Sequence, residues 1–408
     1  MRTTPDAQAS RLLAGTAHCV TNDELVDRLA LGRPLRVKLG IDPTASDIHL
    51  GFAVVLRKLR QFQELGHTAV LILGDYTARV GDPTGRSATR PRLSRAEVDA
   101  NAATYVDQIR DVLLPEPLEV RRNSEWLGAM GIDDVLALTG RTTVARMLER
   151  NDFAERYRTG TPISVLELLY PLLQGQDSVV VRADVELGGT DQLWNLLLAR
   201  QLQEQAGQAP QVALTTPLLE GTDGVEKMSK SLANVIGIRE APGEQFGKLM
   251  SLPDALVPRY LALAADLPPQ RVAETEAALA SRELHPGAAK RLLARAVVDL
   301  YHGAGAGEPA EAGFDRVFKA GQAPEDVPDV PVPPAELADG GIAVARLLAV
   351  TGLVSSNNEG RRMIKQGAVR IDHAVLADPD AVLDAGRVDG RLLSVGKRRW
   401  ARAHVEGA

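Results

Sequence analysis

The stretch RVKLGIDPTASDIHLGFAVVLRKLRQFQEL, residues 36–65, decides the fold class of this chain. It opens with a short apolar run, Arg36 to Leu39, that ends at a glycine. From His49 to Leu65 the apolar residues then recur at helical spacing. A second short apolar run, Ala69 to Leu73, follows and also ends at a glycine. Strand, glycine turn, helix and strand in this order predict the opening of a nucleotide-binding α/β unit with a Rossmann-like sheet.

The rest of the chain divides into segments of different composition. We expect an N-terminal helical extension at residues 1–33, followed by a Rossmann-like catalytic domain at 34–240. Helical stretches that each begin near a proline predict an α-helical domain at 241–320. Residues 321–339 are rich in proline, which breaks helices, so we interpret them as a linker. The pattern of residues 340–408 predicts a small α+β domain.

Composition places the chain among soluble globular proteins. Of its 408 residues, 45% are hydrophobic and 25% charged, and no apolar run approaches the roughly 18 residues of a membrane span. The sequence opens without a signal-peptide pattern, and its single cysteine, Cys19, excludes an internal disulfide and a cysteine-based zinc site. We therefore expect a cytoplasmic protein without a tightly bound metal.

The charge is unevenly distributed along the chain. The net charge of −6 argues against a general nucleic-acid coat protein, which would be basic throughout. From Gly340 onward, eleven Lys and Arg stand against seven Asp and Glu, so this part is near +4 and the preceding part near −10. An acidic body with a basic appendage is the pattern expected of a protein with a local nucleic-acid surface.

Two short motifs indicate nucleotide chemistry. His49-Leu50-Gly51 stands at the start of the predicted helix, where free backbone N–H groups and the helix dipole favour phosphate. By itself it is more often a helix cap with a surface histidine. The second motif, Lys227-Met228-Ser229-Lys230-Ser231, follows a predicted strand at Gln211 to Thr215, and its two ammonium groups can both reach a triphosphate. Most such Lys/Ser runs are solvated loops, but the pairing of the two motifs is hard to obtain by chance.

Together these motifs resemble the paired signatures of class I aminoacyl-tRNA synthetases. The chain is similar to bacterial tyrosyl-tRNA synthetases over essentially its whole length. The resemblance implies that L-tyrosine and ATP, with Mg2+ on the phosphates, form tyrosyl-adenylate, and that the tyrosyl group then passes to the 3′ end of tRNA(Tyr). It also implies that the enzyme is a homodimer and that the helical domain binds the anticodon.

The resemblance assigns site residues position by position. The implied catalytic groups are His49, Lys227, Lys230, Arg86 and Arg90. The implied tyrosine-binding residues are Thr77, Asp82, Asn123, Tyr170, Gln174, Asp177 and Gln192. ATP would contact His49, Gly51, Gly189, Asp191, Lys227, Lys230 and Ser231, and Trp126 is expected in the core.

Asp177 is the residue that would select tyrosine. Tyr170, Gln174 and Asp177 are four and three residues apart, so one helix face carries all three. In the family, the first two help to hold the substrate ammonium, and the carboxylate accepts the phenol's hydrogen bond. A phenylalanine side chain would leave that carboxylate unpaired, which costs about 10⁴ to 10⁵ in specificity. The alternative is a polar stripe on a surface helix.

The basic tail resembles a small RNA-binding module shared with a ribosomal protein. A capped helix begins near Ser356, and a turn and a strand follow it. This spacing suits phosphate contacts on folded RNA. The expected RNA-binding residues are Arg361, Arg362, Lys365, Arg370, Lys397, Arg398 and Arg399.

The chain departs from the family pattern at a few positions. Phe52 stands where relatives usually carry a second histidine, or sometimes asparagine, and phenyl cannot donate a hydrogen bond to ATP. Gln176 replaces a common tyrosine, Arg86 a common lysine, and His373 a common glycine of the tail module.

Three alternatives remain open at the level of sequence. A tryptophanyl enzyme of the same class is disfavoured by Asp177 and by the basic tail. A duplicated synthetase that serves as an RNA-binding or regulatory protein is suggested only by Phe52, and the intact Lys227, Lys230 and Asp82 argue against it. A specialised copy resistant to a tyrosine analogue is the third.

Overall fold

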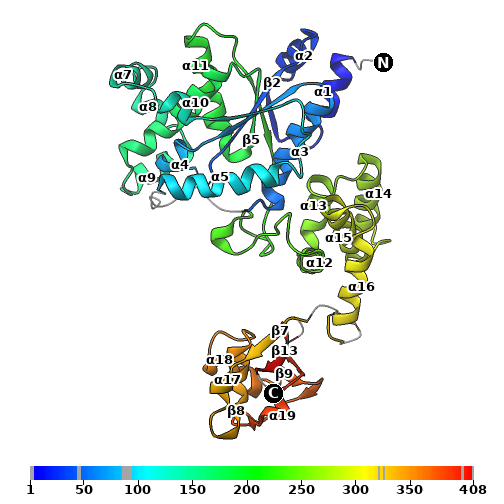
Figure 1. Ribbon diagram of the computed structural model, residues 1–408. Coiled ribbons are helices and arrows are strands. Elements are labelled where there is room, and N and C mark those ends of the chain that lie inside the picture. Colours follow the sequence, from blue (N-terminus) through cyan, green and yellow to red (C-terminus); the bar gives the residue numbers. More distant parts are fainter. Residues whose placement is uncertain are drawn as a thin grey trace. The chain divides into compact units, whose positions relative to one another are not determined.

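The computed structural model describes residues 4–43, 47–84, 94–319, 322–324, 327–396 and 399–406, without the side chains of residues 231, 338 and 339. The chain forms two compact units, Met1–Ala304 and Gly305–Ala408 (Figure 1). The predicted α/β class, with a following helical part and a small α+β domain, is confirmed.

A six-stranded sheet forms the centre of the first unit. Its strand order is β1-β6-β5-β2-β3-β4, and all neighbours are parallel except β1 and β6, which are antiparallel. The chain moves from β2 outward to β4 and then returns to β5 on the other side of β2. This reversal creates a crevice at the carboxyl ends of β2 and β5. The strands are β1 His18–Val20, β2 Arg36–Ile41, β3 Thr68–Leu73, β4 Leu118–Arg122, β5 Val185–Gly189 and β6 Val212–Thr216.

The sequence predicted a purely helical extension for the first 33 residues, but the structure shows a strand there as well. Besides α1 (Pro5–Leu13) and α2 (Asn22–Ala30), they supply β1, which pairs with β6 at the edge of the six-stranded sheet. A three-residue strand of one histidine, one cysteine and one valine has too little periodicity to be recognised in sequence.

Helices cover both faces of the sheet. α3 (Leu50–Glu64) connects β2 to β3, as its periodicity predicted, and it buries Val54, Leu56, Leu59 and Phe62. α10 (Val165–Val181) packs on α11 (Leu193–Gln205) on the opposite face from α3 and α5 (Arg95–Ile109) (Figure 1). The shorter helices are α4 Thr77–Val80, α6 Ser124–Leu127, α7 Ile132–Thr139, α8 Val144–Met147 and α9 Asn151–Arg158.

The first unit ends in four helices. They are α12 Pro242–Met250, α13 Val257–Leu263, α14 Pro269–Ala280 and α15 Pro286–His302. Each has proline in its first turn, where the missing N–H costs no hydrogen bond. This confirms the helical pattern that the sequence predicted for this part.

The second unit carries its own core. A five-stranded sheet of order β10-β9-β12-β13-β7 packs with α17 (Val344–Val350) and α18 (Asn357–Lys365) around buried Leu347, Leu348 and Leu393. The other elements are α16 Gly307–Phe318, β7 Asp329–Val332, β8 Ile342–Ala343, β9 Val369–Ile371, β10 Ala374–Val375, β11 Val382–Leu383, α19 Ala385–Val388, β12 Arg391–Val395 and β13 Arg399–Val405.

The linker prediction for 321–339 is wrong for its second half. β7 lies in this segment, pairs in parallel with β13 and buries Val332 in the core. Pro331 is tolerated because β7 is an edge strand, where one face of the backbone needs no ladder hydrogen bond. Proline content therefore overstated the extent of the linker.

Candidate active site

A cavity of about 350 Å³ opens at the carboxyl ends of β2 and β5, where the strand order reverses. The two sequence motifs meet here, because His49 of the first and Lys227 of the second both line the cavity. The sequence-predicted residues that line the cavity are His49, Gly51, Thr77, Asp82, Tyr170, Gln174, Asp177, Gly189, Asp191, Gln192 and Lys227. Phe52, the departure from the family pattern, also lines it.

His49 is the N-cap of α3. Its Nδ1 accepts a hydrogen bond from the backbone N–H of Phe52 at 3.3 Å. Burial, together with nearby Lys230, lowers the pKa of His49 to about 4, so the imidazole is neutral at physiological pH. A Cβ atom on Gly51 would lie 3.2 Å from His49 Nδ1 and 3.3 Å from Met228 Cβ, so this position has little room for any residue larger than glycine.

The second motif lies against the first. The backbone N–H of Gly51 contacts Met228 Sδ at 3.3 Å. Lys227 Nζ pairs with Asp191 Oδ2 at 2.9 Å, and Lys230 Nζ pairs with Asp47 Oδ2 at 2.6 Å. Both lysines are partly exposed, and their partners are single carboxylates at or near the cavity, so the pairs can open to admit a polyphosphate.

Asn234 holds this loop together, and sequence reasoning missed it. Its buried side chain accepts a hydrogen bond from Ser229 N at 2.8 Å and donates one to Asp223 Oδ2 at 2.6 Å. The same amide nitrogen lies 3.2 Å from Lys227 O. The only signal in the sequence was an asparagine three residues after the lysine–serine motif.

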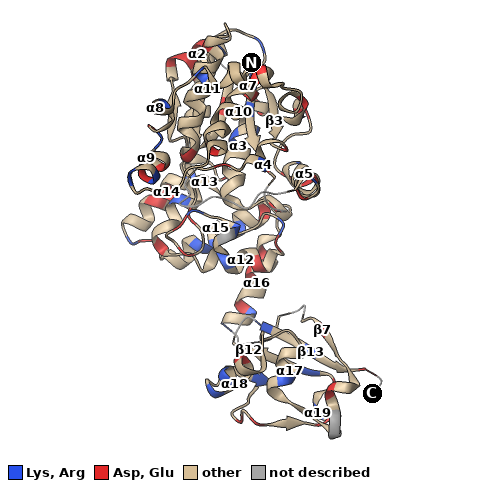
Figure 2. Cartoon of the chain, turned by 90° about the vertical axis from the view of Figure 1, so that its left-hand side faces the viewer, with Lys and Arg blue, Asp and Glu red and all other residues tan. Residues whose placement is uncertain are grey.

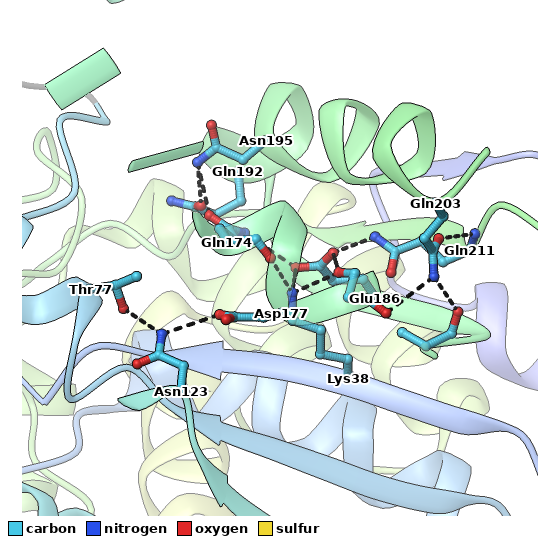
Figure 3. A network of polar contacts seen from close by, with 12 residues as sticks. Lys38, Thr77, Asn123, Gln174, Asp177, Glu186, Gln192, Asn195, Gln203 and Gln211 are labelled. Carbon is cyan, nitrogen blue, oxygen red and sulfur yellow. Dashed lines mark hydrogen bonds and ion pairs between the residues drawn. The ribbon is translucent and has the colours of Figure 1, made fainter. Parts of the chain in front are cut away.

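Asp177 lies at the floor of the cavity, almost fully buried at 3% exposure. Its Oδ1 accepts a hydrogen bond from Trp126 Nε1 at 2.8 Å. Its Oδ2 accepts one from Asn123 Nδ2 at 3.3 Å, which Figure 3 shows. Burial raises the pKa of Asp177 to about 6, while Lys38 and the two donors oppose the rise. The carboxylate is thus ionised at neutral pH and can accept a further hydrogen bond from the cavity side.

Two residues near Asp177 differ from expectation in their placement. Trp126 packs against the core as expected, but its indole N–H also fixes the Asp177 carboxylate. Asn123 does not line the cavity; it is fully buried and bridges Asp177, Thr77 and the backbone N–H of Tyr76. Trp126 therefore acts on the cavity through Asp177, and Asn123 acts through both Asp177 and Thr77.

Asp42 opens the segment that precedes the His49 motif in the sequence, but sequence reasoning gave it no role in the site. Tyr170 donates its hydroxyl to Asp42 Oδ2 at 3.0 Å, and Thr77 donates its hydroxyl to Asp42 Oδ1 at 2.7 Å. Burial, reinforced by the charges of Asp82 and Asp177, raises the pKa of Asp42 to about 7. Asp42, Asp82 and Asp177 are three of the five aspartates that line this cavity, and such a group of carboxylates attracts a cationic group. The signal available was its position directly after β2, at the carboxyl edge of the sheet.

The raised pKa of Asp42 makes a testable prediction about stability. Because the folded-state pKa is near 7 and the ordinary value is 3.8, ionisation of Asp42 destabilises the folded protein. That cost is absent near pH 4 and below, grows as pH rises to about 7, and is constant above. We expect Asp42→Asn to raise the Tm at pH 8 by roughly 4 °C or more, and to give no gain at pH 4.

Thermal unfolding at both pH values measures this effect. Asp27→Asn, which removes an exposed carboxylate from α2, is the matched control and should not change the Tm at either pH. An Asp42→Asn protein with an unchanged or lower Tm at pH 8 would contradict the raised pKa.

Three predicted residues cannot be placed fully. Arg86 and Arg90 lie outside the described residues. Ser231 belongs to a short 3-10 helix, Lys230–Leu232, but its side chain is not described.

Three basic residues of the second unit lie close together on α18 (Figure 2). Arg361, Arg362 and Lys365 are exposed on this helix, and Arg370 follows on β9. Arg399 pairs with Glu359 at 3.1 Å and donates to Leu353 O at 2.7 Å, so it is partly used within the fold. Lys397 and Arg398 lie outside the described residues.

Two features are absent from the described part of the chain. No helix there is both long and apolar enough to cross a membrane. No group of three or more His, Cys, Asp or Glu side chains in the same residues is placed to hold a metal ion.

Comparison with known proteins agrees with this geometry. The family model described as tRNA synthetases class I (W and Y) matches residues 30–319. A protein of Moorella thermoacetica named tyrosine–tRNA ligase is 50% identical over 398 residues, which are 97% of this chain and 95% of the relative. A tyrosine–tRNA ligase of Thermotoga maritima is 45% identical over 400 residues, 98% of each chain.

Solved structures show the same fold at lower identity. The crystal structure of a tyrosyl-tRNA synthetase complexed with L-tyrosine from Archaeoglobus fulgidus has a TM-score of 0.62 at 23% identity, over 75% of this chain and 99% of that chain. A C-terminally truncated mitochondrial tyrosyl-tRNA synthetase of Aspergillus nidulans has a TM-score of 0.63 at 22% identity, over 78% and 95%.

Proposed function

The chain belongs to the class I tRNA synthetases of the tryptophan and tyrosine group, and from this premise we propose that it is a tyrosine–tRNA ligase. It activates L-tyrosine with ATP to tyrosyl-adenylate and then transfers the tyrosyl group to the 3′ end of tRNA(Tyr). The observation that carries the choice of tyrosine is the buried carboxylate of Asp177, which faces the cavity with both oxygens already oriented by donors.

Tyrosine binds with its phenol toward Asp177 and its ammonium toward the other carboxylates. The phenol O–H donates to Asp177, and the ammonium is neutralised by Asp82, with Tyr170 and Gln174 beside it. Thr77 closes the side of the ring pocket. A side chain without a hydroxyl would leave the Asp177 carboxylate buried and unpaired on that side, which disfavours phenylalanine.

Activation needs no nucleophile from the enzyme. The tyrosine carboxylate attacks the α-phosphorus of ATP in line, the bond to the bridging oxygen breaks, and pyrophosphate leaves with its electron pair. The neutral His49 donates a hydrogen bond to the phosphates, and Lys227 and Lys230 leave their carboxylate partners to neutralise the departing charge. Gly51, Gly189, Asp191 and Ser231 contact the nucleotide, and Arg86 and Arg90 contact the pyrophosphate end.

Magnesium is expected as a partner of ATP. The donor set of the cavity suits this, because Asp47 and Asp191 are single carboxylates on separate elements, each paired with a lysine. Such carboxylates can accept from water around a phosphate-bound ion, and the phosphate oxygens supply most of its ligands. Bound in this way, the ion would neutralise phosphate charge.

Amino-acid-dependent exchange between ATP and pyrophosphate tests the proposed function. The purified full-length chain should support exchange with tyrosine and with no other amino acid. Exchange with tryptophan and none with tyrosine would establish the tryptophanyl alternative, and tRNA binding without any exchange would establish the regulatory one.

Phe52 gives a second test within the same assay. Its ring lines the cavity beside Gly51, at a position where an imidazole could reach the phosphates. We expect Phe52→His to raise kcat of the exchange severalfold, because it adds a hydrogen-bond donor where charge develops in the transition state. An unchanged kcat with a normal Tm would show that another group already supplies this contact. A loss of folding would show that Phe52 is a packing residue.

The homodimer is also a proposal, supported by an apolar face on the first unit. Ile132, Leu136, Val144, Tyr157 and Val165 are each 62–75% exposed and lie on or next to consecutive helices α7 to α10. Large apolar side chains at this exposure are disfavoured on a monomer and suit a twofold interface with a second copy.

Substituting the apolar face tests the dimer. Leu136→Asp with Val165→Asp should halve the mass measured by light scattering, because two buried carboxylates cannot be paired across the interface. Val375→Asp, at an apolar position of the second unit that is 53% exposed, should leave the mass unchanged. A wild-type chain of monomer mass would overturn the proposal.

The remaining proposals concern tRNA and location. The α-helical part, 241–320, binds the anticodon region, and the domain 340–408 contacts folded RNA through Arg361, Arg362, Lys365, Arg370, Lys397, Arg398 and Arg399. The exposed positions on α18 support this. The catalytic domain spans 34–240, and the protein acts in the cytoplasm, where tRNA is charged.

A further inference from the structure

A buried ion pair lies beneath the cavity. Lys38 on β2 and Glu186 on β5 are partners across the two strands, and both side chains are at most 1% exposed. Lys38 Nζ contacts Glu186 Oε1 at 2.9 Å, Ser178 Oγ at 2.7 Å and Gln174 O at 2.9 Å, so all three of its N–H groups have acceptors (Figure 3). Burying two charges costs more than the pair returns in many proteins, which suggests a use other than stability.

The pair acts on Gln174, which lines the cavity. Gln174 donates its Nε2 to Glu186 Oε1 at 3.2 Å. A carboxylate can only accept, so the amide nitrogen of Gln174 must face Glu186. The amide oxygen of Gln174 therefore faces the other way, toward Asn195 and the cavity, where it accepts from Asn195 Nδ2 at 3.1 Å.

The side-chain amides of Gln174, Asn195 and Gln192 form a row linked by hydrogen bonds. Glu186 orients Gln174 in this row, and a group that can only donate orients Asn195. Arg150, which is buried and paired with Asp152, donates its Nη1 to Asn195 Oδ1 at 3.3 Å. The Nδ2 of Asn195 must then face the two glutamines, and it also donates to Gln192 Oε1 at 3.0 Å. This leaves the Nε2 of Gln192 directed at the cavity, where it donates to Asp82 Oδ2 at 2.9 Å.

We propose that Glu186 and Arg150 are positioning residues that set the hydrogen-bond polarity of Gln174, Asn195 and Gln192. The cavity then presents an acceptor, Gln174 Oε1, to the ammonium of a free α-amino acid, and a donor, Gln192 Nε2, to its carboxylate. Lys38 pairs with Glu186 at 2.9 Å, and a carboxylate in such a pair can only accept. This inference rests on the proposed function, because it assumes that a free amino acid occupies the cavity.

Asn195→Asp changes the hydrogen-bond polarity at the middle of the row of three amides, because it replaces the donor group of residue 195 by an acceptor. An aspartate there can only accept, pairs with Arg150, and turns the Gln192 amide so that its oxygen faces the substrate carboxylate. We expect the Kd of tyrosine to rise about 30-fold. The Kd of tyramine, which lacks the carboxylate, should stay within threefold or fall. The Kd of 3-(4-hydroxyphenyl)propionate, which lacks the ammonium, should rise with that of tyrosine.

Calorimetric titration of the purified full-length chain with the three ligands measures this pattern without requiring turnover. A general structural defect would weaken the binding of tyrosine and of tyramine alike, and that result overturns the proposal. Unchanged affinity for all three ligands also overturns it.

A second variant avoids dependence on the folding of Asn195→Asp. Lys38→Met with Glu186→Gln removes both buried charges and lets residue 186 donate as well as accept, so the Gln174 amide is then held only from the Arg150 side, through Asn195. We expect a Tm within a few degrees of wild type and an about 10-fold rise in the Kd of tyrosine. If tyrosine binds this folded double variant as tightly as wild type, the proposal is wrong.

Gln211→Leu is the matched control. Gln211 contacts Glu186 Oε2 on the side away from the cavity and does not touch Gln174, so its loss should leave all three Kd values within twofold. The same titrations separate this inference from the proposed function. A wild-type chain that binds no tyrosine refutes the function. Normal binding by the wild type, with variants that do not distinguish the three ligands, refutes only the polarity inference.

Discussion

Replacing Asp177 with asparagine should reduce the selectivity for tyrosine over phenylalanine at least 100-fold. The wild-type selectivity expected for a site that hydrogen-bonds the substrate hydroxyl is about 10⁴ to 10⁵. Both oxygens of Asp177 already accept from donors, Trp126 Nε1 and Asn123 Nδ2. An amide nitrogen in place of one oxygen would face a donor, so the side chain could no longer present a well-oriented acceptor to the phenol.

The measurement is kcat/KM for tyrosine and for phenylalanine in pyrophosphate exchange. The kcat/KM for tyrosine should fall by nearly the whole 100-fold. The kcat/KM for phenylalanine should change little, because phenylalanine has no hydroxyl to bond the carboxylate. The KM of ATP should stay within twofold, since Asp177 lies at the floor of the cavity and away from the lysine motif. Equal losses for both amino acids would mean that Asp177 only supports the fold, and the assignment to tyrosine would fail.

Replacing Lys227 with alanine should lower kcat of adenylate formation about 10² to 10³-fold and leave the KM of tyrosine unchanged. An ammonium group that meets charge developing on pyrophosphate stabilises the transition state more than the ground state, and removing one such group has this size of effect. Lys227 is available for this, because it is partly exposed and, among the described residues, its ion pair is with Asp191, which lines the cavity.

Single-turnover formation of tyrosyl-adenylate separates the two parameters. Lys227→Arg keeps the charge and should recover part of the rate, though not all, because guanidinium geometry differs from that of an ammonium. Lys319→Ala, which removes an exposed lysine paired with Asp315 on α16, is the control and should not change kcat. A loss of tyrosine affinity equal to the loss of rate would show that Lys227 shapes the pocket and does not act on the phosphates.

Local patterns in the sequence were sufficient where the structure depends on neighbours along the chain. The periodicity of residues 49–65 predicted α3, and prolines marked the starts of the helices after residue 241. The same reasoning failed where a segment is ordered by a distant partner. β1 forms because it pairs with β6 about 190 residues away, and β7 forms because β13 lies beside it.

The candidate site shows the same division. Its residue types could be named from motifs, because motifs record which chemical groups a site requires. The hydrogen bonds between these groups could not be predicted, because the partners are far apart in the sequence. Asp42 and Tyr170 are 128 residues apart, and Trp126 and Asp177 are 51 apart. Nothing local in the sequence distinguishes these partners from other buried polar residues.

By itself the sequence determined the fold class, the order of the main helices and the identity of eleven residues that line the cavity, because hydrophobic spacing and short motifs act within one turn or one strand. Only the tertiary structure decided which carboxylates share a cavity, which donors orient Asp177, and which charges direct the amides of Gln174 and Gln192. Those features arise where strands β2 and β5 meet, and hydrogen-bond polarity and pKa depend on distances that are defined only after the chain has packed.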